Sequence, residues 1–560
     1  MAKKIVRREG HQSLSFASPL LGRIMFSRGV RKAEDLDHSL KGLLAPDGFL
    51  GMKEAARILA KAIELESSIL IVGDFDADGA TSCVLMVTVL RALGAREVNY
   101  LVPNRFKFGY GLTPEIVDVA TEFNPNIIVT VDNGISSIDG VAHANSLGIS
   151  VVVTDHHLPG QELPAAAAIC NPNQNGCKFP SKALAGVGVA YYLLSVLRAE
   201  LRRMNWFAHH KEVNLAEWLD LVALGTVADV VPMDQNNRRL VEQGIRRMRA
   251  GLCRPGLKAM LLKAGVNPLY ITTRDLAFSI APRLNAAGRL QDMSIGIECL
   301  LADETRASEL AERLDELNNQ RKKIETDMRE RALSYLENMS LEDEVATGLC
   351  FYQPDWHQGV VGIVASRVKE KSNLPVIAFA RSSDDELKGS GRSVSGFHLR
   401  DALDAIATRN PGLLLKFGGH AMAAGLSLLE VDFARFRREF DLEARRALGE
   451  ARIAQVVMSD GEIEEPLTAQ LAKEIEAAAP WGQGFPIPEF DGKFEILDQR
   501  IVGGRHLKLL LQPKIGDPVE AIYFNHGGLA ENRHIHCAYR LEVNRFKGIE
   551  KPQLIVSVIL

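Results

Sequence analysis

Three aspartates at alternate positions carry the clearest chemistry in this sequence. Asp74, Asp76 and Asp78 precede Gly79 and follow the apolar residues 69–72, which have the length and composition of a buried strand. Alternate residues of an extended chain share one face, and carboxylates gathered so closely repel one another unless a proton or a cation neutralises them. Carboxylate oxygens are ligands that suit Mg²⁺ and Mn²⁺. The pattern therefore favours a site for a divalent metal ion.

Two other interpretations compete with the metal site. The same pattern opens an EF-hand calcium loop, but that loop requires a glutamate at its twelfth position, where this sequence has Leu85. An EF-hand loop would also follow a helix, whereas this segment follows a predicted strand. A solvated acidic turn is the second alternative, and the motif by itself leaves it open.

Further acids and histidines follow the next predicted strands. Asp132 comes directly after residues 127–131, and the sequence Asp-His-His at 155–157 comes directly after residues 150–154. Helices are predicted at residues 55–63, before the first strand, and at residues 81–93 and 136–147, between later strands. Continuous β-branched strands that alternate with helices predict a parallel α/β sheet. Such sheets bind ligands beyond the carboxyl ends of their strands, so these side chains are expected to converge at one edge, which a chance acidic turn explains poorly.

A fourth acid, Asp229, lies among apolar residues in the sequence Gly-Thr-Val-Ala-Asp-Val-Val-Pro at 225–232. It follows helices predicted at residues 184–201 and 215–224. A carboxylate in such surroundings caps a helix, anchors a hydrogen bond or completes the metal site. The residue alone leaves these alternatives open.

The composition is that of a globular protein with several domains. Hydrophobic residues make up 46% and charged residues 24% of the 560 residues, and this length suggests about three or four domains. The first residues are charged and lack an apolar core, so no secretory signal is expected. The longest uncharged apolar stretch, residues 183–197, is shorter than the roughly 20 residues of a membrane span and predicts a buried helix.

Charge and cysteine content narrow the functional classes. The net charge of −4 does not indicate a nucleic-acid-binding protein, so any such surface must be local. The seven cysteines form no Cys-x-x-Cys pair, which favours reduced thiols and a cytoplasmic protein. The sequence has no Gly-x-Ser-x-Gly elbow, no Walker loop and no convincing cysteine nucleophile, so a water-derived nucleophile fits best.

The rest of the chain predicts three more structural parts. Residues 303–339 have apolar side chains at helical spacing, interrupted by Arg321, and predict a long helix that connects two domains. An α/β pattern restarts at residues 345–429, with glycine-rich pieces that are either plain turns or phosphate contacts. From Lys493 onward, five short predicted strands suit an OB-fold barrel, although most aromatic side chains of a small barrel lie in its core. The candidate base-stacking residues of this barrel are Phe494, Tyr523, Phe524, Tyr539 and Phe546.

The ordered motifs resemble those of the DHH phosphoesterase superfamily. The resemblance lies in Gly-Asp-Phe-Asp-Ala-Asp-Gly at 73–79, Val-Asp-Asn-Gly at 131–134, Asp-His-His at 155–157 and Ala-Asp at 228–229. More narrowly, the chain is similar to bacterial exonucleases of this superfamily that are specific for single-stranded DNA, through residues 281–289, 391–393 and 418–425. The similarity extends from about residue 55 to the carboxyl terminus. Family members often carry Gly-Asn-Pro where this sequence has Gly-Phe-Pro at 484–486.

The resemblance implies two divalent metal ions, Mn²⁺ or Mg²⁺, at the predicted sheet edge. The implied ligands are Asp74, Asp76, Asp78, Asp132, His156 and Asp229. Asp132 would bridge the two ions, Asp76 would bind one of them, and Asp74 would be a ligand or lie just behind the ligands. The other three residues would bind the second ion. An imidazole among the ligands suits Mn²⁺ at least as well as Mg²⁺.

Two residues beside the implied ligands would take part in catalysis. Asp155 would orient an imidazole, and His157 would contact the scissile phosphate and assist departure of the leaving oxygen. A DHH-associated domain would close over the substrate, with the strand held between it and the catalytic domain. The implied phosphate-binding residues are Arg283, Arg289, Arg392, Ser393 and His420.

The resemblance also implies a domain order and an activity. The domains would be a lead-in at 1–48, a DHH catalytic domain at 49–300, a connecting helix at 301–340, a DHH-associated domain at 341–450 and an OB-fold domain at 451–560. The implied activity is hydrolysis of single-stranded DNA from 5′ to 3′, which releases 5′ mononucleotides during recombination and repair. A single-strand-binding protein and a recombination helicase are implied partners of a monomeric enzyme that has no membrane association.

Two other functions stand as alternatives. A phosphoesterase for short oligonucleotides or cyclic dinucleotides belongs to the same superfamily, but the length of the chain and its carboxyl-terminal domain disfavour it. An inactive nucleic-acid-binding relative would have lost metal ligands, whereas every implied acid and His156 are present here.

Overall fold

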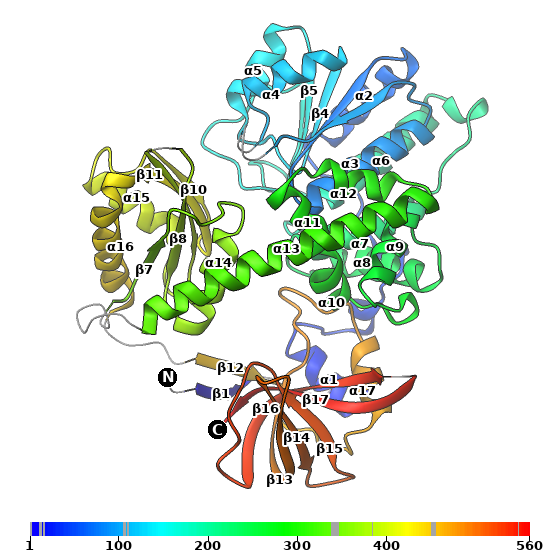
Figure 1. Cartoon of the computed structure of the whole chain (residues 1–560). Coiled ribbons are helices and arrows are strands. Elements are labelled where there is room, and N and C mark those ends of the chain that lie inside the picture. Colours follow the sequence, from blue (N-terminus) through cyan, green and yellow to red (C-terminus); the bar gives the residue numbers. More distant parts are fainter. Residues whose placement is uncertain are drawn as a thin grey trace. The chain divides into compact units, whose positions relative to one another are not determined.

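A computed structural model of the chain describes residues 3–9, 14, 17–104, 108, 111–337, 346–383, 385–449, 455–546 and 548–560. Two compact units make up the molecule (Figure 1). One unit contains Lys3–Asp315 together with Val456–Leu560, and the other contains Glu316–Gln455. The predicted domain junctions near residues 340 and 450 lie outside the described residues.

A parallel sheet forms the centre of the first unit. Its strand order is β3-β2-β4-β5-β6, and every neighbouring pair is parallel. The strands are β2 Ile69–Gly73, β3 Val98–Leu101, β4 Ile127–Val131, β5 Ser150–Thr154 and β6 Ala168–Cys170. Every residue of β2 and β4 is buried, as expected of strands covered on both faces. The predicted parallel α/β fold is therefore confirmed.

Helices cover both faces of this sheet (Figure 1). On one face, α4 and α5 pack on Leu70, Val72 and Val151 in one continuous apolar core. On the other face lie α2, α3 and α6, which contact the strands directly. The helices are α2 Met52–Glu64, α3 Ala77–Ala92, α4 Pro114–Ala120, α5 Ile138–Ser146 and α6 Gly186–Arg203. The apolar stretch predicted to form a buried helix lies in α6 from Gly186 onward. No helix of the described residues could cross a membrane.

A layer of further helices packs on α3. Helix α7 lies against both α3 and α8, and α12 contacts α3. The elements are α7 Leu219–Ala228, α8 Gln235–Arg249, α9 Pro255–Lys263, α10 Thr273–Asp275, the π-helical turn Leu276–Ile280, α11 Ala281–Leu290 and α12 Ser294–Leu301.

The amino-terminal lead-in contacts two parts of the first unit. Strand β1 Lys3–Arg7 pairs with β12 Gln455–Ser459, and α1 Pro19–Phe26 follows it. Arg28, just after α1, donates two hydrogen bonds of 2.7 and 2.9 Å to the buried carboxylate of Asp460. Farther along, Gln243 of α8 donates to the backbone oxygen of His38. A strand and a buried ion pair thus join the lead-in to the carboxyl-terminal region as well as to α8.

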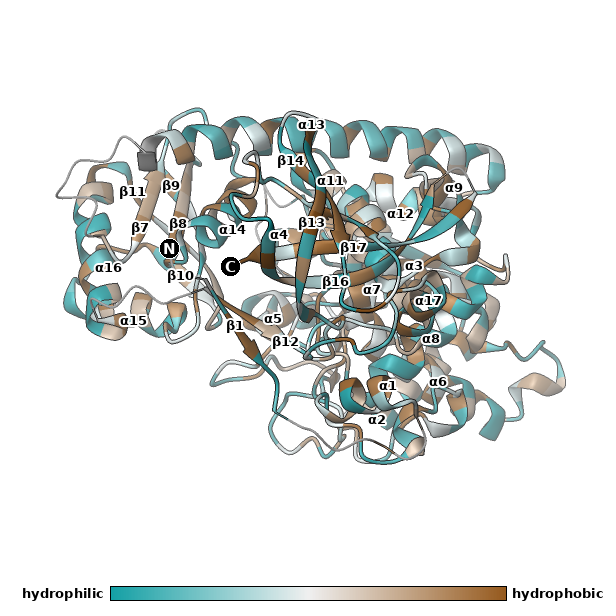
Figure 2. Cartoon of the chain, turned by 90° about the horizontal axis from the view of Figure 1, so that it is seen from below, coloured by the Kyte–Doolittle hydropathy of each residue, from teal (hydrophilic) through white to brown (hydrophobic). Residues whose placement is uncertain are grey.

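A long helix, α13 Glu304–Glu337, runs from one unit into the other and confirms the predicted connector. Most of its length is hydrophilic (Figure 2), while Leu314, Leu317 and Met328 are buried. Arg321, which interrupts the apolar stripe, pairs with Glu325 one turn later at 2.6 Å. The predicted end of this segment at residue 339 lies outside the described residues.

The second unit contains a mixed sheet with helices. Its strand order is β10-β11-β9-β8-β7, where β7 and β8 are parallel and the other pairs are antiparallel. The strands are β7 Leu349–Tyr352, β8 Val376–Arg381, β9 Glu386–Arg392, β10 Lys416–Gly419 and β11 Ala423–Leu429. The helices are α14 Val361–Ser372, α15 Leu399–Arg409 and α16 Phe433–Leu448. The α/β pattern predicted to restart after the connector is present.

The carboxyl-terminal strands close into a barrel of order β13-β14-β15-β17-β16. They are β13 Phe490–Val502, β14 His506–Gln512, β15 Val519–Tyr523, β16 His534–Phe546 and β17 Ile549–Ile559. Phe494 and Tyr539 are buried in the barrel core, which removes them as base-stacking candidates, whereas Phe524 and Phe546 are exposed. Helix α17 Ala469–Ala477 precedes the barrel.

Phe485, which stands where family members often carry asparagine, packs inside the protein. Its ring stacks on Trp481 with ring centres 5.4 Å apart, and the guanidinium of Arg238 lies 4.2 Å above it. The side chain is 1% exposed. The phenyl ring therefore packs the segment before the barrel onto α8.

Candidate metal centre

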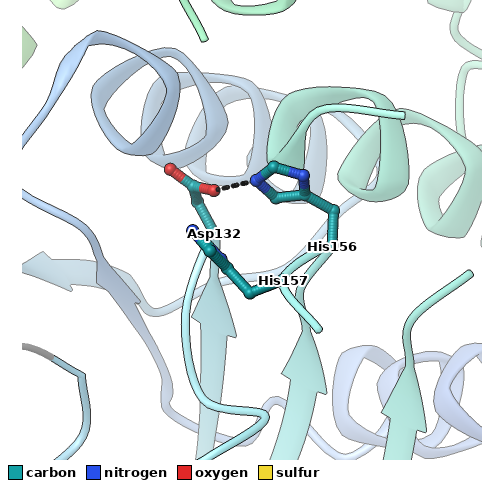
Figure 3. Close-up of side chains that lie close together, drawn as sticks. All are labelled: Asp132, His156 and His157. Atoms are coloured by element: carbon teal, nitrogen blue, oxygen red, sulfur yellow. Dashed lines mark ion pairs between the residues drawn. The ribbon is translucent and has the colours of Figure 1, made fainter. Parts of the chain in front are cut away.

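The loops that follow β2, β4 and β5 bring acids and imidazoles together at the carboxyl edge of the parallel sheet. Asp132 begins the loop after β4, and His156 and His157 lie in the loop after β5 (Figure 3). Nε2 of His156 is 3.1 Å from Oδ1 of Asp132 and 3.4 Å from Oδ2 of Asp229. The edge rule for parallel sheets thus located the cluster from sequence.

Two helix amino termini fix the aspartate loop after β2. Asp76 caps α3, and its Oδ1 accepts hydrogen bonds from the amides of Asp78 and Gly79 at 2.9 and 3.0 Å. Asp78 accepts from the first two amides of α6, with Gly186 at 2.6 Å and Val187 at 3.0 Å. Unpaired amides and the helix dipole favour negative charge at both places. The carboxylates are therefore positioned by backbone groups before any cation binds.

Asp132 adopts a conformation that few side chains tolerate. Its φ is +62°, in the left-handed region, and its side chain is 2% exposed. A Cβ at position 186 would lie 2.6 Å from the Cβ of Asp132, so only glycine allows α6 to approach this closely. Strained residues of this kind gather at functional sites, where the surrounding structure holds them in place.

Asp229 follows the carboxyl end of α7, where a carboxylate cannot cap the helix carbonyls, so its position favours the ligand interpretation over the helix cap. It is the residue that follows the last turn of the helix, and its carboxylate points toward His156. The next residue, Val230, has φ of +61°, which is unusual for a β-branched side chain. The chain therefore turns sharply where it presents the Asp229 carboxylate.

A buried carboxylate orients the second histidine. Oδ1 of Asp155 lies 2.7 Å from Nδ1 of His157 and also accepts from the amide of His156. Its Oδ2 accepts from the amide of Ile135. Although burial raises it, the pKa of Asp155 is lowered by the hydrogen bond and charge of His157. Burial lowers the pKa of His157, but the hydrogen bond and charge of Asp155 outweigh it and raise that pKa to about 9.

The other carboxylates repel one another strongly. Burial and the charge of Asp76 raise the pKa of Asp78 to about 7. Burial and the charges of neighbouring aspartates raise the pKa values of Asp132 and Asp229 well above their ordinary range. A bound cation offsets this repulsion and so stabilises the ionised form of the carboxylates.

The ligand atoms lie close enough to coordinate metal ions. Three groups each have all their ligand atoms within 4.8 Å of one another. They are Asp74, Asp76 and Asp132; Asp78, His156 and Asp229; and Asp132, His156 and His157. Carboxylate oxygens with one or two imidazole nitrogens fit Mn²⁺ well and also accommodate Mg²⁺.

Several asparagines support the site and were missed by the sequence reasoning. Asn171 and Asn173 donate to the backbone oxygens of His157 and His156 at 2.9 and 2.6 Å. Asn171 directly follows β6, so the rule that selected the other edge residues could have selected it as well. Asn285 accepts from the amide of Ala77, 208 positions away in sequence, and no local signal indicates this contact.

Two of the predicted phosphate-binding residues lie on α11 in the first unit. Arg283 is almost buried, and its guanidinium pairs with Asp315 at 2.7 Å and donates to the backbone oxygen of Ser279. Arg289 lies in the last turn of the same helix, one residue after Gly288. A Cβ at position 288 would lie 2.0 Å from the backbone oxygen of Phe75, so this part of α11 packs directly on the aspartate loop.

The other three predicted phosphate-binding residues lie together in the second unit. Arg392 ends β9, donates to the backbone oxygen of Gly391 at 2.7 Å, and has a pKa lowered by burial. The hydroxyl of Ser393 is buried and donates to the backbone oxygen of Phe397, while its amide donates to Met422. His420 is exposed in the turn between β10 and β11. The end of β9 therefore lies next to the turn between β10 and β11.

The fold and the site define a phosphoesterase of the DHH class. The DHH family amino-terminal domain matches residues 68–226, the DHHA1 domain matches residues 344–445, and the RecJ OB domain matches residues 460–557. The chain is 53% identical to the single-stranded-DNA-specific exonuclease RecJ of Dickeya dadantii over 96% of this chain and 95% of that protein. It is 51% identical to the RecJ of Escherichia coli over 97% and 96%. The chain therefore belongs to the RecJ family.

Solved structures of RecJ proteins have the same fold. RecJ from Thermus thermophilus in complex with Mn²⁺ matches with a TM-score of 0.83 and 29% identity, over 100% of this chain and 79% of that one. An exonuclease RecJ bound to manganese matches with a TM-score of 0.60 and 33% identity, over 72% and 96%. The predicted fold class, including the carboxyl-terminal OB-fold, is thus confirmed.

Proposed function

We propose that this protein is a metal-dependent exonuclease that hydrolyses the phosphodiester bonds of single-stranded DNA. The observation that carries the proposal is the convergence of Asp76, Asp132, His156 and Asp229, from separate segments, into one crowded anionic site. The relatives that match it over nearly their whole length carry the name of this activity. A phosphoesterase for short oligonucleotides or dinucleotides lacks such support.

The proposed metal ligands are those expected from the resemblance. Asp132 shares one group with Asp74 and Asp76, and its Oδ1 lies 3.1 Å from Nε2 of His156, so it would bridge two ions. Asp78, His156 and Asp229 would bind the second ion. Two divalent ions, when bound, activate water and stabilise both the attacking and the leaving oxygen of a phosphodiester.

His157 supplies a proton donor beside this site. Its Nδ1 faces the carboxylate of Asp155, and we assign the contact with the substrate to Nε2. The hydrogen bond and charge of Asp155 raise the pKa of the imidazole and so favour its charged form. A charged imidazole can donate a hydrogen bond to a phosphate oxygen and protonate the oxygen that leaves. Asp155 is a positioning residue, since it acts on the substrate only through His157.

The remaining predicted residues would hold the DNA backbone. Guanidinium groups and glycine-rich turns bind phosphates through charge-assisted hydrogen bonds. We assign this role to Arg283, Arg289, Arg392, Ser393 and His420. For Arg283, binding a phosphate requires exchange of its present partner, Asp315.

The finer features of the proposal come from the family. They are 5′-to-3′ polarity, release of 5′ mononucleotides and a role in recombination and repair. A monomer in the cytoplasm, with a single-strand-binding protein and a recombination helicase as partners, completes the proposal, and the seven unbonded cysteines agree with that compartment. The proposed domains are 1–48, 49–300, 301–340, 341–450 and 451–560.

One set of substrates tests the proposed function. A long single strand labelled at its 5′ end, the same strand in a duplex, and a dinucleotide are each incubated with Mn²⁺ and with EDTA. The expected result is release of labelled mononucleotide from the long single strand alone, and only with Mn²⁺. Preferential cleavage of the dinucleotide would favour the alternative, and no cleavage with Mn²⁺ bound would point to an inactive binding protein.

A further inference from the structure

A small cavity lies where the amino-terminal lead-in meets the loop that follows β12, within the first unit. Its volume is about 120 Å³, and its lining contains three arginines of the lead-in and three carboxylates of the loop. These charged residues are Arg7, Arg8, Arg23, Asp460, Glu462 and Glu464. None of them belongs to the metal centre or to the predicted phosphate-binding residues, so the cavity is a separate feature of the fold.

The carboxylates of this lining are largely neutralised by partners outside it. Asp460 accepts hydrogen bonds from Arg28 through both of its oxygens, and both side chains are 1% exposed. Glu462 pairs with Lys514 at 2.7 Å. Glu464 is exposed to solvent, which screens its charge. The negative charge that acts on the cavity is therefore smaller than that of three free carboxylates.

Two of the three arginines lack a comparable partner. Arg7 donates two hydrogen bonds to the carboxylate of Asp491. Nε of Arg8, in contrast, lies 3.6 Å from Oδ1 of Asp460, which is too far for a hydrogen bond. Arg23 donates through Nη2 to a backbone oxygen at 2.7 Å. Across the part of the chain that the structure describes, Nε of Arg8 and Nε of Arg23 are both buried without a hydrogen-bond acceptor.

The charges at the cavity favour an anion as the acceptor. A buried donor without an acceptor costs free energy, and in native proteins such donors are usually satisfied by water or by an ion. The guanidinium of Arg23 lies against the backbone of Gly461, where a Cβ would be 3.7 Å from Cζ, so it is held beside the cavity. Because Arg8 and Arg23 are opposed mainly by the exposed Glu464, the positive charge is in excess.

We propose that this cavity binds a phosphate group, which accepts hydrogen bonds from the guanidinium groups of Arg8 and Arg23. Guanidinium groups present paired donors that match the oxygens of a phosphate. A water molecule takes about 30 Å³, so the cavity has room for one phosphate but not for a nucleoside. The side chain of Arg7 is 55% exposed, so the cavity is open to solvent on that side. The ligand is therefore inorganic phosphate or a phosphate monoester whose other groups stay outside.

A phosphate bound here fastens the lead-in to the loop after β12. Arg8 directly follows β1, which pairs with β12, and Arg23 lies in the last turn of α1. One anion would thus connect both elements of the lead-in to the segment that precedes the barrel. A ligand that binds only the folded state raises its stability. The inference does not depend on the proposed function, because it involves no residue of the metal centre.

The test measures binding to the full chain in EDTA, at an ionic strength kept constant with NaCl. Isothermal titration calorimetry gives the Kd, and thermal unfolding gives the shift of the melting temperature, for inorganic phosphate, thymidine 5′-monophosphate and thymidine. The variants are Arg8→Gln and Arg23→Gln. Arg31→Gln is the matched control, because Arg31 also lies in the lead-in but packs on the ring of Phe26. Arg392→Gln removes a predicted phosphate-binding residue of the other unit.

Inorganic phosphate at a hundred times its Kd should raise the melting temperature of wild type by about 3 °C. Arg8→Gln and Arg23→Gln should each weaken the Kd at least tenfold, and their melting temperatures should respond correspondingly less. Arg31→Gln and Arg392→Gln should keep the wild-type Kd at this site. An equal shift with thymidine 5′-monophosphate shows that phosphate monoesters enter, a shift with inorganic phosphate alone restricts the site to the free ion, and thymidine should cause no shift in either case.

Several outcomes would overturn the inference. One is an equal Kd for phosphate in wild type, Arg8→Gln and Arg23→Gln. A second is an equal loss in Arg31→Gln, which would attribute binding to the general charge of the lead-in. A loss in Arg392→Gln alone would place the bound phosphate in the other unit. If phosphate changes nothing in wild type, water satisfies these guanidinium groups and the inference fails, whereas the proposed exonuclease activity is unaffected.

Discussion

Oδ2 of Asp78 lies 2.6 Å from the backbone nitrogen of Gly186, the first residue of α6. The same glycine faces Asp132 from the other side, because a Cβ there would lie 2.6 Å from the Asp132 Cβ and 2.7 Å from its Oδ1. The amide of Gly186 therefore donates to the carboxylate of Asp78, and the absence of a side chain at Gly186 leaves space for the carboxylate of Asp132. The amino terminus of α6 is as much a part of the site as the carboxylates.

The first prediction is that Gly186→Ala lowers kcat about a hundredfold while the protein stays folded. The added methyl group displaces Asp132, and a shift of about 1 Å in a catalytic group costs roughly a hundredfold in rate. Steady-state rates at saturating Mn²⁺ measure the effect, and circular dichroism checks the fold.

Gly188→Ala is the matched control for this substitution. It lies on the same helix, but the three atoms nearest to a Cβ there all belong to the side chain of Leu184, with Cδ2 nearest at 3.0 Å, and a leucine side chain can move. Its activity should stay within about twofold of wild type. If the two alanine variants are equally active, close packing at Gly186 does not position Asp132.

The sequence predicted the carboxylates but not this helix contact. Runs such as residues 127–131 are local signals for buried strands, and in a parallel sheet the following residues must meet at one edge. The contact between Asp78 and Gly186 joins residues 108 positions apart, and Asn285 reaches Ala77 over 208 positions. Contacts of this kind depend on how helices pack, which periodicity does not specify.

The contacts of the lead-in also join residues that are far apart in the sequence, and the sequence did not predict them. The lead-in is basic and weakly periodic, so it carries no local signal for the elements that it contacts. Pairing of β1 with β12, and the buried ion pair of Arg28 with Asp460, depend on a partner more than 430 residues away. The barrel was better predicted, because each of its strands is a local pattern.

A second prediction concerns the charge repulsion in the metal-free site. The pKa of Asp132 is raised on folding, so above the ordinary value of 3.8 its ionised form destabilises the folded state. Asp132→Asn removes this charge and should raise the melting temperature in EDTA by a few degrees. The same variant should lose activity at least a hundredfold.

Thermal unfolding with and without Mn²⁺ checks this prediction. Wild type should gain stability when Mn²⁺ is added, because the ion binds only the folded site, and the gain should shrink in Asp132→Asn. Asp498→Asn, on an exposed position of β13, serves as the control for the loss of one carboxylate. A lower melting temperature for Asp132→Asn in EDTA would contradict the repulsion argument.

A third prediction concerns the pH dependence of the reaction. In wild type the pKa of His157 is about 9, so the imidazole keeps its proton at neutral pH and loses it as the pH rises through that value. Asp155→Asn removes the carboxylate that raises this pKa, and burial then lowers it. The alkaline limb of the kcat profile should therefore shift to lower pH.

Profiles of kcat measured with Mg²⁺ from about pH 6 to about pH 10 test the shift. Asp118→Asn is the matched control, because Asp118 pairs with Nε2 of His143 at 2.7 Å on the protein surface, away from the metal centre. Its profile should coincide with that of wild type. An unchanged alkaline limb in Asp155→Asn would show that His157 is not the titrating acid.

The last prediction concerns stability at low pH and centres on Asp491 in β13. This buried carboxylate accepts hydrogen bonds from Arg7, Ser459 and His536 and so joins the lead-in, β12 and the barrel. Burial raises its pKa, but these partners outweigh burial and lower it to about 2 from an ordinary 3.8. A pKa depressed on folding stabilises the protein above 3.8, and this contribution is lost as the pH falls through about 2. Because Arg7 is half exposed, the contribution is about 1–2 kcal/mol.

Asp491→Asn should thus lower the free energy of unfolding in urea by this amount at neutral pH and by much less near pH 2. A difference that persists unchanged at low pH would mean that the aspartate contributes packing and not charge.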